Sequence, residues 1–80
     1  MTRHQIAAKI AAATGTACEI ELVKGDGYWY FTVSDVARNI WESKSECVMY
    51  LGSIPASRWI EWGVSFVNQV EADQAERIAV

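Results

Sequence analysis

Alternating apolar and polar residues on both sides of a Gly-Asp-Gly step predict a β-hairpin. Residues 17–24 and residues 28–33 both alternate, and Asp26 and Gly27 between them tolerate positive φ. Alternation returns over residues 46–51, which predicts a third strand there. The pattern therefore indicates a three-stranded antiparallel sheet.

Helical spacing of apolar residues precedes and follows these strands. Thr2 and Gln5 form a capping-box pattern and Gly15 suits a C-terminal cap, so the first helix is expected over residues 3–14. Its many alanines give it a thin face that allows close packing.

A second helix is expected after Pro55, a residue that suits a first helical turn. An apolar stripe at helical spacing follows, made of Trp59, Trp62, Gly63, Phe66, Val67 and Val70. Glycine within such a stripe predicts a close contact with the alanine-rich first helix. Over residues 71–80 the stripe weakens, so this end either extends the helix into solvent or frays.

Residues 34–45 separate the second and third predicted strands and are too many for a tight hairpin. Ser34 and Asp35 suit the cap of a short helical turn. We interpret the segment as an excursion that Trp41 pins to the core.

The predicted order is α-β-β-β-α, an α+β fold of a single domain over residues 1–80. Side chains alternate along a strand, so one sheet face collects mostly apolar residues, namely Cys18, Ile20, Leu22, Trp29, Phe31, Val33, Cys47, Met49 and Leu51. Both helices are expected to pack on this face, because it is the continuously apolar one.

The opposite face mixes aromatic rings with carboxylates and has no basic residue; it holds Glu19, Glu21, Val23, Tyr28, Tyr30, Thr32, Glu46, Val48 and Tyr50. This is either an ordinary solvated face or a surface that binds a protein rich in Arg and Lys. On the second interpretation the partner-binding residues are Glu19, Glu21, Asp26, Tyr28, Tyr30, Glu42, Glu46 and Tyr50.

Composition narrows the function classes. A chain of 80 residues has little core to spare for a deep catalytic cleft, and neither cysteine forms a metal-ligand or catalytic pattern with His4, so we expect no enzyme, metal or cofactor. Cys18 and Cys47 are expected to be buried free thiols on the two outer strands, too far apart for a disulfide. The net charge of −3 disfavours direct binding of nucleic acid. No apolar signal-like or membrane-spanning run is seen, so a cytoplasmic protein is expected.

Double-stranded-RNA-binding domains share the predicted element order, which keeps a nucleic-acid-binding regulator as an alternative. The Lys and Arg residues are scattered along the chain, whereas those domains cluster them. A toxin–antitoxin component is a further alternative.

Four segments, residues 25–31, 41–45, 48–51 and 58–66, resemble a group of small proteins encoded on bacterial phages, plasmids and integrated elements. The resemblance covers most of residues 5–70. In size, acidity and lack of catalytic residues the chain also resembles anti-CRISPR proteins, small phage-encoded inhibitors of Cas effectors. That resemblance implies a non-enzymatic inhibitor in the bacterial cytoplasm that binds a Cas effector and blocks its engagement of nucleic acid.

Overall fold

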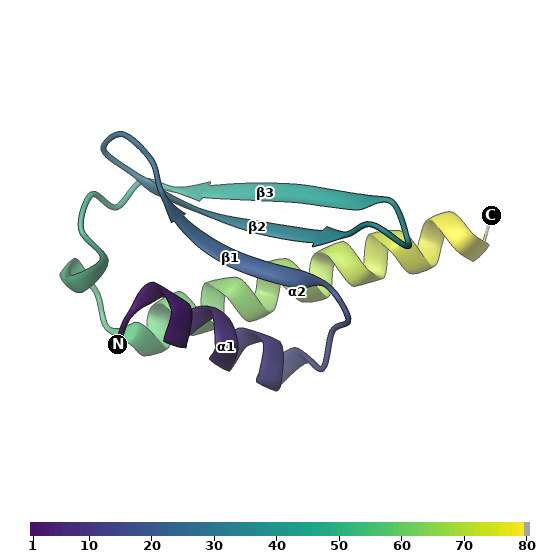
Figure 1. Ribbon diagram of the computed structural model, residues 1–80, viewed down its shortest axis with the longest axis horizontal. Coiled ribbons are helices and arrows are strands. Elements are labelled where there is room, and N and C mark those ends of the chain that lie inside the picture. The colour runs from purple at the N-terminus through teal and green to yellow at the C-terminus, as the bar shows by residue number, and fades with distance from the viewer. Residues whose placement is uncertain (80) are drawn as a thin grey trace.

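Three antiparallel strands form a sheet in the computed structural model, and two helices pack on one of its faces (Figure 1). The structure describes residues 1–79. In chain order the elements are α1 (Arg3–Thr14), β1 (Glu19–Lys24), β2 (Trp29–Asp35), β3 (Ile40–Glu46), the short 3₁₀ helix η1 (Leu51–Ser53) and α2 (Ala56–Ala79). The predicted α-β-β-β-α order and the α+β class are confirmed.

Helix α1 begins and ends as its sequence predicts. The Thr2 hydroxyl accepts from the Gln5 amide and the Gln5 side chain accepts from the Thr2 amide, which satisfies two free donors at the helix start. Gly15 ends the helix in the left-handed region, at φ 63°. Ile6 and Ile10 are its buried residues, so α1 contributes a narrow apolar edge to the core.

The hairpin between β1 and β2 turns at Asp26 and Gly27, where Gly27 has φ 81°. The Gly25 amide donates to the Tyr28 carbonyl at 2.8 Å, and this bond fixes the register that places Leu22 opposite Phe31. The predicted hairpin is therefore confirmed.

The third strand lies earlier than predicted, at Ile40–Glu46 instead of residues 46–51. A tight turn follows β2, because Asp35 accepts from the Arg38 amide and guanidinium and Asn39 adopts φ 54°. The expected excursion of residues 34–45 is thus wrong: its second half is β3. Trp41 does not pin it to the core, since Ile40 is the buried residue and Trp41 is 68% exposed.

The segment that was predicted as the third strand instead crosses one end of the core. The indole N–H groups of Trp29 and Trp59 donate to the carbonyls of Met49 and Leu51, at 3.2 and 2.9 Å. Cys47 and Met49 are exposed here, so their predicted burial is wrong, and Leu51 is only partly buried. Both cysteines are free thiols, as expected, and Cys18 is buried.

Helix α2 buries its predicted stripe beneath β2. Trp59 is fully buried and meets the ring of Phe31 edge-on, with 6.2 Å between ring centroids. Gly63 lies against Ile10 of α1 so closely that a Cβ atom there would overlap the Ile10 side chain, which confirms the predicted close contact. The helix continues past the sheet to Ala79, and Val80 lies outside the described residues (Figure 1).

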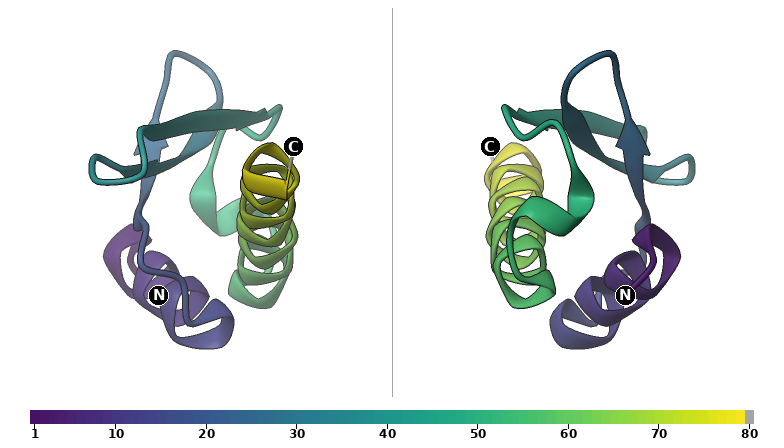
Figure 2. Two further views of the ribbon diagram at one scale, coloured as in Figure 1. Left: turned by 90° about the vertical axis from the view of Figure 1, so that its right-hand side faces the viewer. Right: turned by 90° about the vertical axis from the view of Figure 1, so that its left-hand side faces the viewer.

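Seen end-on, α1 lies beneath the β1 side of the sheet and α2 beneath the other side, while the opposite sheet face is uncovered (Figure 2). We call the uncovered side the outer face and the helix-covered side the inner face. Within residues 1–79, the outer face is therefore the broad sheet surface that no helix covers.

Candidate functional site

The outer face consists of three rows of side chains that cross the sheet. Strand register sets these rows, because directly opposed residues of antiparallel strands point the same way. The rows are Glu19–Ser34–Trp41, Glu21–Thr32–Ser43 and Val23–Tyr30–Ser45. The face thus has carboxylates along one edge, hydroxyls in the centre and an indole at the other edge.

Trp41 is the most exposed of the four tryptophans on this chain, with 68% of its surface in contact with solvent. Its neighbour across the strand pair is Ser34, a small residue that leaves the ring uncovered. Trp41 was expected to pin an excursion to the core, and the shift of β3 to Ile40–Glu46 places it on the outer face instead.

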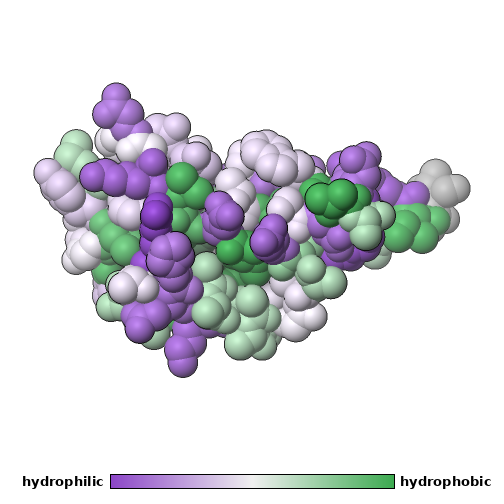
Figure 3. All heavy atoms as spheres, viewed as in Figure 1, coloured by the Kyte–Doolittle hydropathy of each residue, from purple (hydrophilic) through white to green (hydrophobic). Residues whose placement is uncertain are grey.

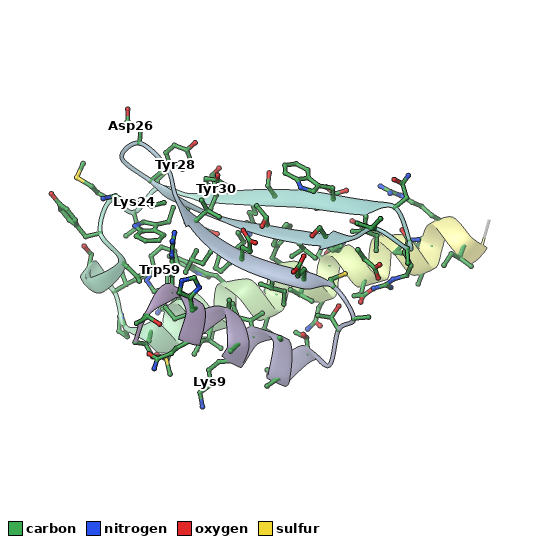
Figure 4. The ribbon with its side chains drawn as sticks, viewed as in Figure 1. Lys9, Lys24, Asp26, Tyr28, Tyr30 and Trp59 are labelled. Carbon is green, nitrogen blue, oxygen red and sulfur yellow. The ribbon has the colours of Figure 1, made fainter. Side chains whose placement is uncertain are left out.

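Two tyrosines lie at the hairpin end of the same side. The rings of Tyr28 and Tyr30 are 5.9 Å apart, and the Tyr28 ring lies across the backbone of Gly25, where a Cβ atom would come within 2.5 Å of it. Tyr28 is 37% exposed and Tyr30 is half-buried. Figure 4 shows both beside the hairpin whose tip carries Asp26. The two rings therefore form a preordered aromatic pair.

Of the eight predicted partner-binding residues, Asp26 lies at the hairpin tip, and Glu42, Glu46 and Tyr50 lie off the outer face. Glu42 and Glu46 oppose Val33 and Trp29, so they belong to the inner side of β3. Glu46 lies 3.9 Å from Lys44 on that same side. Tyr50 precedes η1, outside the sheet, and is 65% exposed. Glu46 and Tyr50 were placed on the outer face because a third strand was expected at residues 46–51, and Glu42 was expected in the excursion before it; β3 at Ile40–Glu46 shows both positions to be wrong.

The acidic character of the outer face is confined to β1. Among the strand residues that point outward, Glu19 and Glu21 are the charged ones, and neither Lys nor Arg occurs. The predicted absence of basic residues on this face is thus correct for the described strands, but the carboxylates are fewer than expected.

A polar cluster at the far end of the sheet joins three segments of the chain. The Arg38 guanidinium donates to Asp35 and to Glu71, both at 2.6 Å, and Glu71 also accepts from the Thr16 hydroxyl at 2.6 Å. Arg38 further approaches the Cys18 sulfur at 3.3 Å. The cluster ties the β2–β3 turn and the start of β1 to α2.

These contacts shift the pKa values of the charged groups in the cluster. The hydrogen bond from Arg38 lowers the pKa of Asp35, and hydrogen bonds from Arg38 and Thr16 lower the pKa of Glu71. The same bonds, to Glu71 first and Asp35 second, raise the pKa of Arg38. All three groups therefore stay charged at neutral pH, and every one has a partner, which is typical of a structural tie.

Other kinds of site find little support within residues 1–79. No group of three or more His, Cys, Asp or Glu side chains there could hold a metal ion. No described helix is long and apolar enough to cross a bilayer. Comparison with protein-family models, with curated proteins and with solved structures found no match. The outer face and the grooves of the molecule are therefore the candidate sites within the described residues.

Proposed function

We propose that the protein is a non-enzymatic inhibitor or adaptor that binds a protein partner through its outer face. One observation carries the proposal: Trp41 is 68% exposed on an uncovered sheet face that also presents Tyr28 and Tyr30. Tryptophan and tyrosine are the residues most enriched among the few that dominate binding energy at protein interfaces.

The arrangement supports different roles for the aromatic and the acidic residues of the outer face. Trp41 offers a large ring framed by small hydroxyl residues, so a partner could bury the ring without displacing neighbouring side chains. Glu19 and Glu21 stand at the opposite edge, where rim charges mainly speed encounter with a surface of opposite sign. A partner with a basic, partly apolar surface suits this combination.

A nucleic-acid-handling protein in the bacterial cytoplasm, such as a CRISPR effector complex, is the partner class we propose. Its support is the resemblance to mobile-element proteins and to anti-CRISPR proteins, together with the net charge of −3. Such a partner has a basic groove for phosphates, and acidic side chains compete for that groove through the same attraction. With two carboxylates on the outer face, the aromatic contacts would supply the larger share of affinity.

A nucleic-acid-binding regulator is the second candidate, favoured by the helix and strand order. The placement of the basic side chains argues against this candidate. Arg38, Lys44 and Arg58 each lie within 4.0 Å of a carboxylate, and the outer strand positions carry no Lys or Arg. Binding to duplex DNA or RNA that weakens steeply with added salt would favour this candidate over the first.

Affinity capture from bacterial lysate, followed by affinity measurement on the captured partner, tests the proposal. Replacing Trp41 with Ala should weaken binding by about thirtyfold or more, the ~2 kcal/mol expected of a central aromatic anchor. Tyr50→Ala is the matched control, because Tyr50 is equally exposed but outside the sheet. Equal affinity of the Trp41 variant and the wild type would contradict the proposal, provided that both melt at the same temperature.

A further inference from the structure

A groove runs between α1 and the free edge of β1, separate from the outer face. Its volume is about 500 Å³, within the ~300–1,000 Å³ typical of ligand sites. The helix side of the groove is formed by Ala7, Ala8 and Ala11, with Arg3 and His4 at one end. Figure 3 shows apolar surface along α1 below the more hydrophilic residues of β1.

The backbone of β1 has free hydrogen-bonding groups along this groove. The Gly25–Tyr28 bond closes the hairpin, and in an antiparallel pair the bonded positions alternate, so Val23, Glu21 and Glu19 direct their N–H and C=O groups toward β2. The groups of Ile20, Leu22 and Lys24 therefore point to the open edge. A free edge of this kind is a template for an additional strand.

The side chains along the edge favour a particular sequence in that strand. A residue opposite Ile20 or Leu22 would point inward, over the alanines of α1, where small to medium apolar side chains fit. A residue opposite Glu19 or Glu21 would point outward and face a carboxylate, which favours Lys or Arg. Lys9, the basic residue in the middle of α1, points away from the sheet and so does not oppose such a peptide (Figure 4).

We infer that the β1 edge binds an extended peptide segment of a partner protein, in which apolar residues alternate with Lys or Arg. The segment adds to the sheet antiparallel to β1, because this continues the pairing of the sheet and antiparallel ladders are slightly the more stable. The inference goes beyond the proposed function and does not depend on it, since the groove and Trp41 lie on opposite edge strands.

A second copy of the chain fits the edge poorly. In the register centred on Glu21 the two Glu21 carboxylates would oppose each other directly. In registers that pair the two strands along most of their length, the two copies of α1 would lie beneath neighbouring strands ~4.8 Å apart, whereas packed helix axes need ~8–10 Å. A free peptide brings no helix with it, so it avoids this clash.

Nuclear magnetic resonance titration with a six-residue peptide that alternates lysine and valine, with blocked ends, tests the inference. Binding should shift and protect the amides of Ile20 and Leu22, whose N–H groups would gain partners. A peptide that alternates glutamate and valine should bind at least about tenfold more weakly, because its carboxylates would face Glu19 and Glu21. N-methylation of the valines should also lower affinity at least about tenfold, since those N–H groups form the new ladder.

Two alanine-to-phenylalanine variants of α1, one inside the groove and one outside it, test whether the peptide binds in the groove. Ala8→Phe fills the groove and should reduce peptide affinity at least about tenfold, whereas Ala12→Phe, at an exposed position outside the groove, should leave it unchanged. Trp41→Ala should also leave it unchanged, so failure here and failure of the proposed function are distinguishable. Equal binding to the Ala8 and Ala12 variants, equal binding of the methylated peptide, or protection at β3 instead of β1 would overturn the inference.

Discussion

The two edge strands of the sheet, β1 and β3, differ in the side chains that they direct toward the inner face. On β1 two of the three inward residues, Ile20 and Leu22, pack above α1, and Leu22 is only 3% exposed. The third, Lys24, lies at the hairpin end and is exposed. On β3 the first inward residue, Ile40, is buried, but those that follow are charged, namely Glu42, Lys44 and Glu46. One edge is thus held by core packing, and the other mainly by its backbone pairing with β2.

The difference shows that the packing of an edge strand and its protection against pairing with a further strand are separate properties. Charged residues that point inward on an edge strand discourage a further strand from adding, because the added strand would have to bury them. On β3 that protection covers most of the strand, through Glu42, Lys44 and Glu46; on β1 it is limited to Lys24 at the hairpin end, and the free backbone beside Ile20 and Leu22 borders an apolar groove. The edge with the better packing is therefore also the edge that remains available for pairing.

The largest expected effect contrasts two residues that face each other across β2 and β3. Phe31 is fully buried and Lys44 opposite it is exposed. Phe31→Ala should lower the free energy of unfolding by about 3–5 kcal/mol, because it leaves a cavity beneath the sheet. Lys44→Ala should change it by less than about 0.5 kcal/mol. Urea denaturation of both variants measures the contrast, and comparable losses would show that β3 contributes to the core as much as β2.

A smaller effect is expected where α2 holds the β2–β3 turn. Glu71→Gln removes the ion pair with Arg38 and should cost about 1 kcal/mol at pH 7, a modest value because both side chains are partly exposed to solvent. Hydrogen exchange should then accelerate more in β3 than in β1, since the cluster anchors the turn that leads into β3. Uniform acceleration in both strands would contradict that anchoring role.

The same cluster predicts a pH dependence of stability. Asp35 and Glu71 have a lower pKa in the folded protein than their ordinary values of 3.8 and 4.5, so the unfolded chain binds more protons in acid. Their stabilisation is complete above those ordinary values and is lost as the pH falls through the lowered ones. The stability difference between wild type and Glu71→Gln should therefore shrink below pH 4.5, as urea titrations at several pH values would measure.

The smallest effect on stability is expected from removing the inward charges of β3. The double variant Glu42→Val and Lys44→Val should change the free energy of unfolding by less than about 0.5 kcal/mol. It should nevertheless self-associate, because the edge loses the charges that oppose strand addition. Analytical ultracentrifugation over a range of concentrations measures this, with Ser43→Val on the outer face as the control. A monomeric double variant would mean that another feature protects this edge.

The sequence predicted the parts of the fold whose inward residues are apolar. The hairpin, β2 and the α2 stripe follow from periodicity, and Glu19, Glu21 and Tyr30 lie on the predicted face because that strand pair was assigned in the correct register. The position of β3 could not be predicted in this way, because the inward positions that follow Ile40 are charged and give no apolar alternation. The turn before it depends on the Asp35 side chain and on a left-handed Asn39, which hydrophobic periodicity does not report.

The site was predicted only as far as that register holds. Because β3 lies at Ile40–Glu46, Glu46 and Tyr50 are not on the outer face where they were predicted. Glu42 points inward from a strand instead of lying in an excursion, and Trp41 points outward. The β1 groove depends on how α1 lies beside the strand edge, a tertiary relation that local periodicity does not encode. Neither surface carries a sequence motif that names its partner.

The contrast in exposure between Trp41 and Trp59 lets tryptophan fluorescence report separately on the outer face and on the core. Trp59 is wholly shielded from solvent, so its emission should lie at shorter wavelength and should change only when the core opens. Trp41 is 68% exposed, so it should emit at longer wavelength and be the indole that iodide or acrylamide quenches first. Loss of that quenching on addition of a partner would report coverage of the outer face without any label, while the shielded signal confirms that the fold is unchanged.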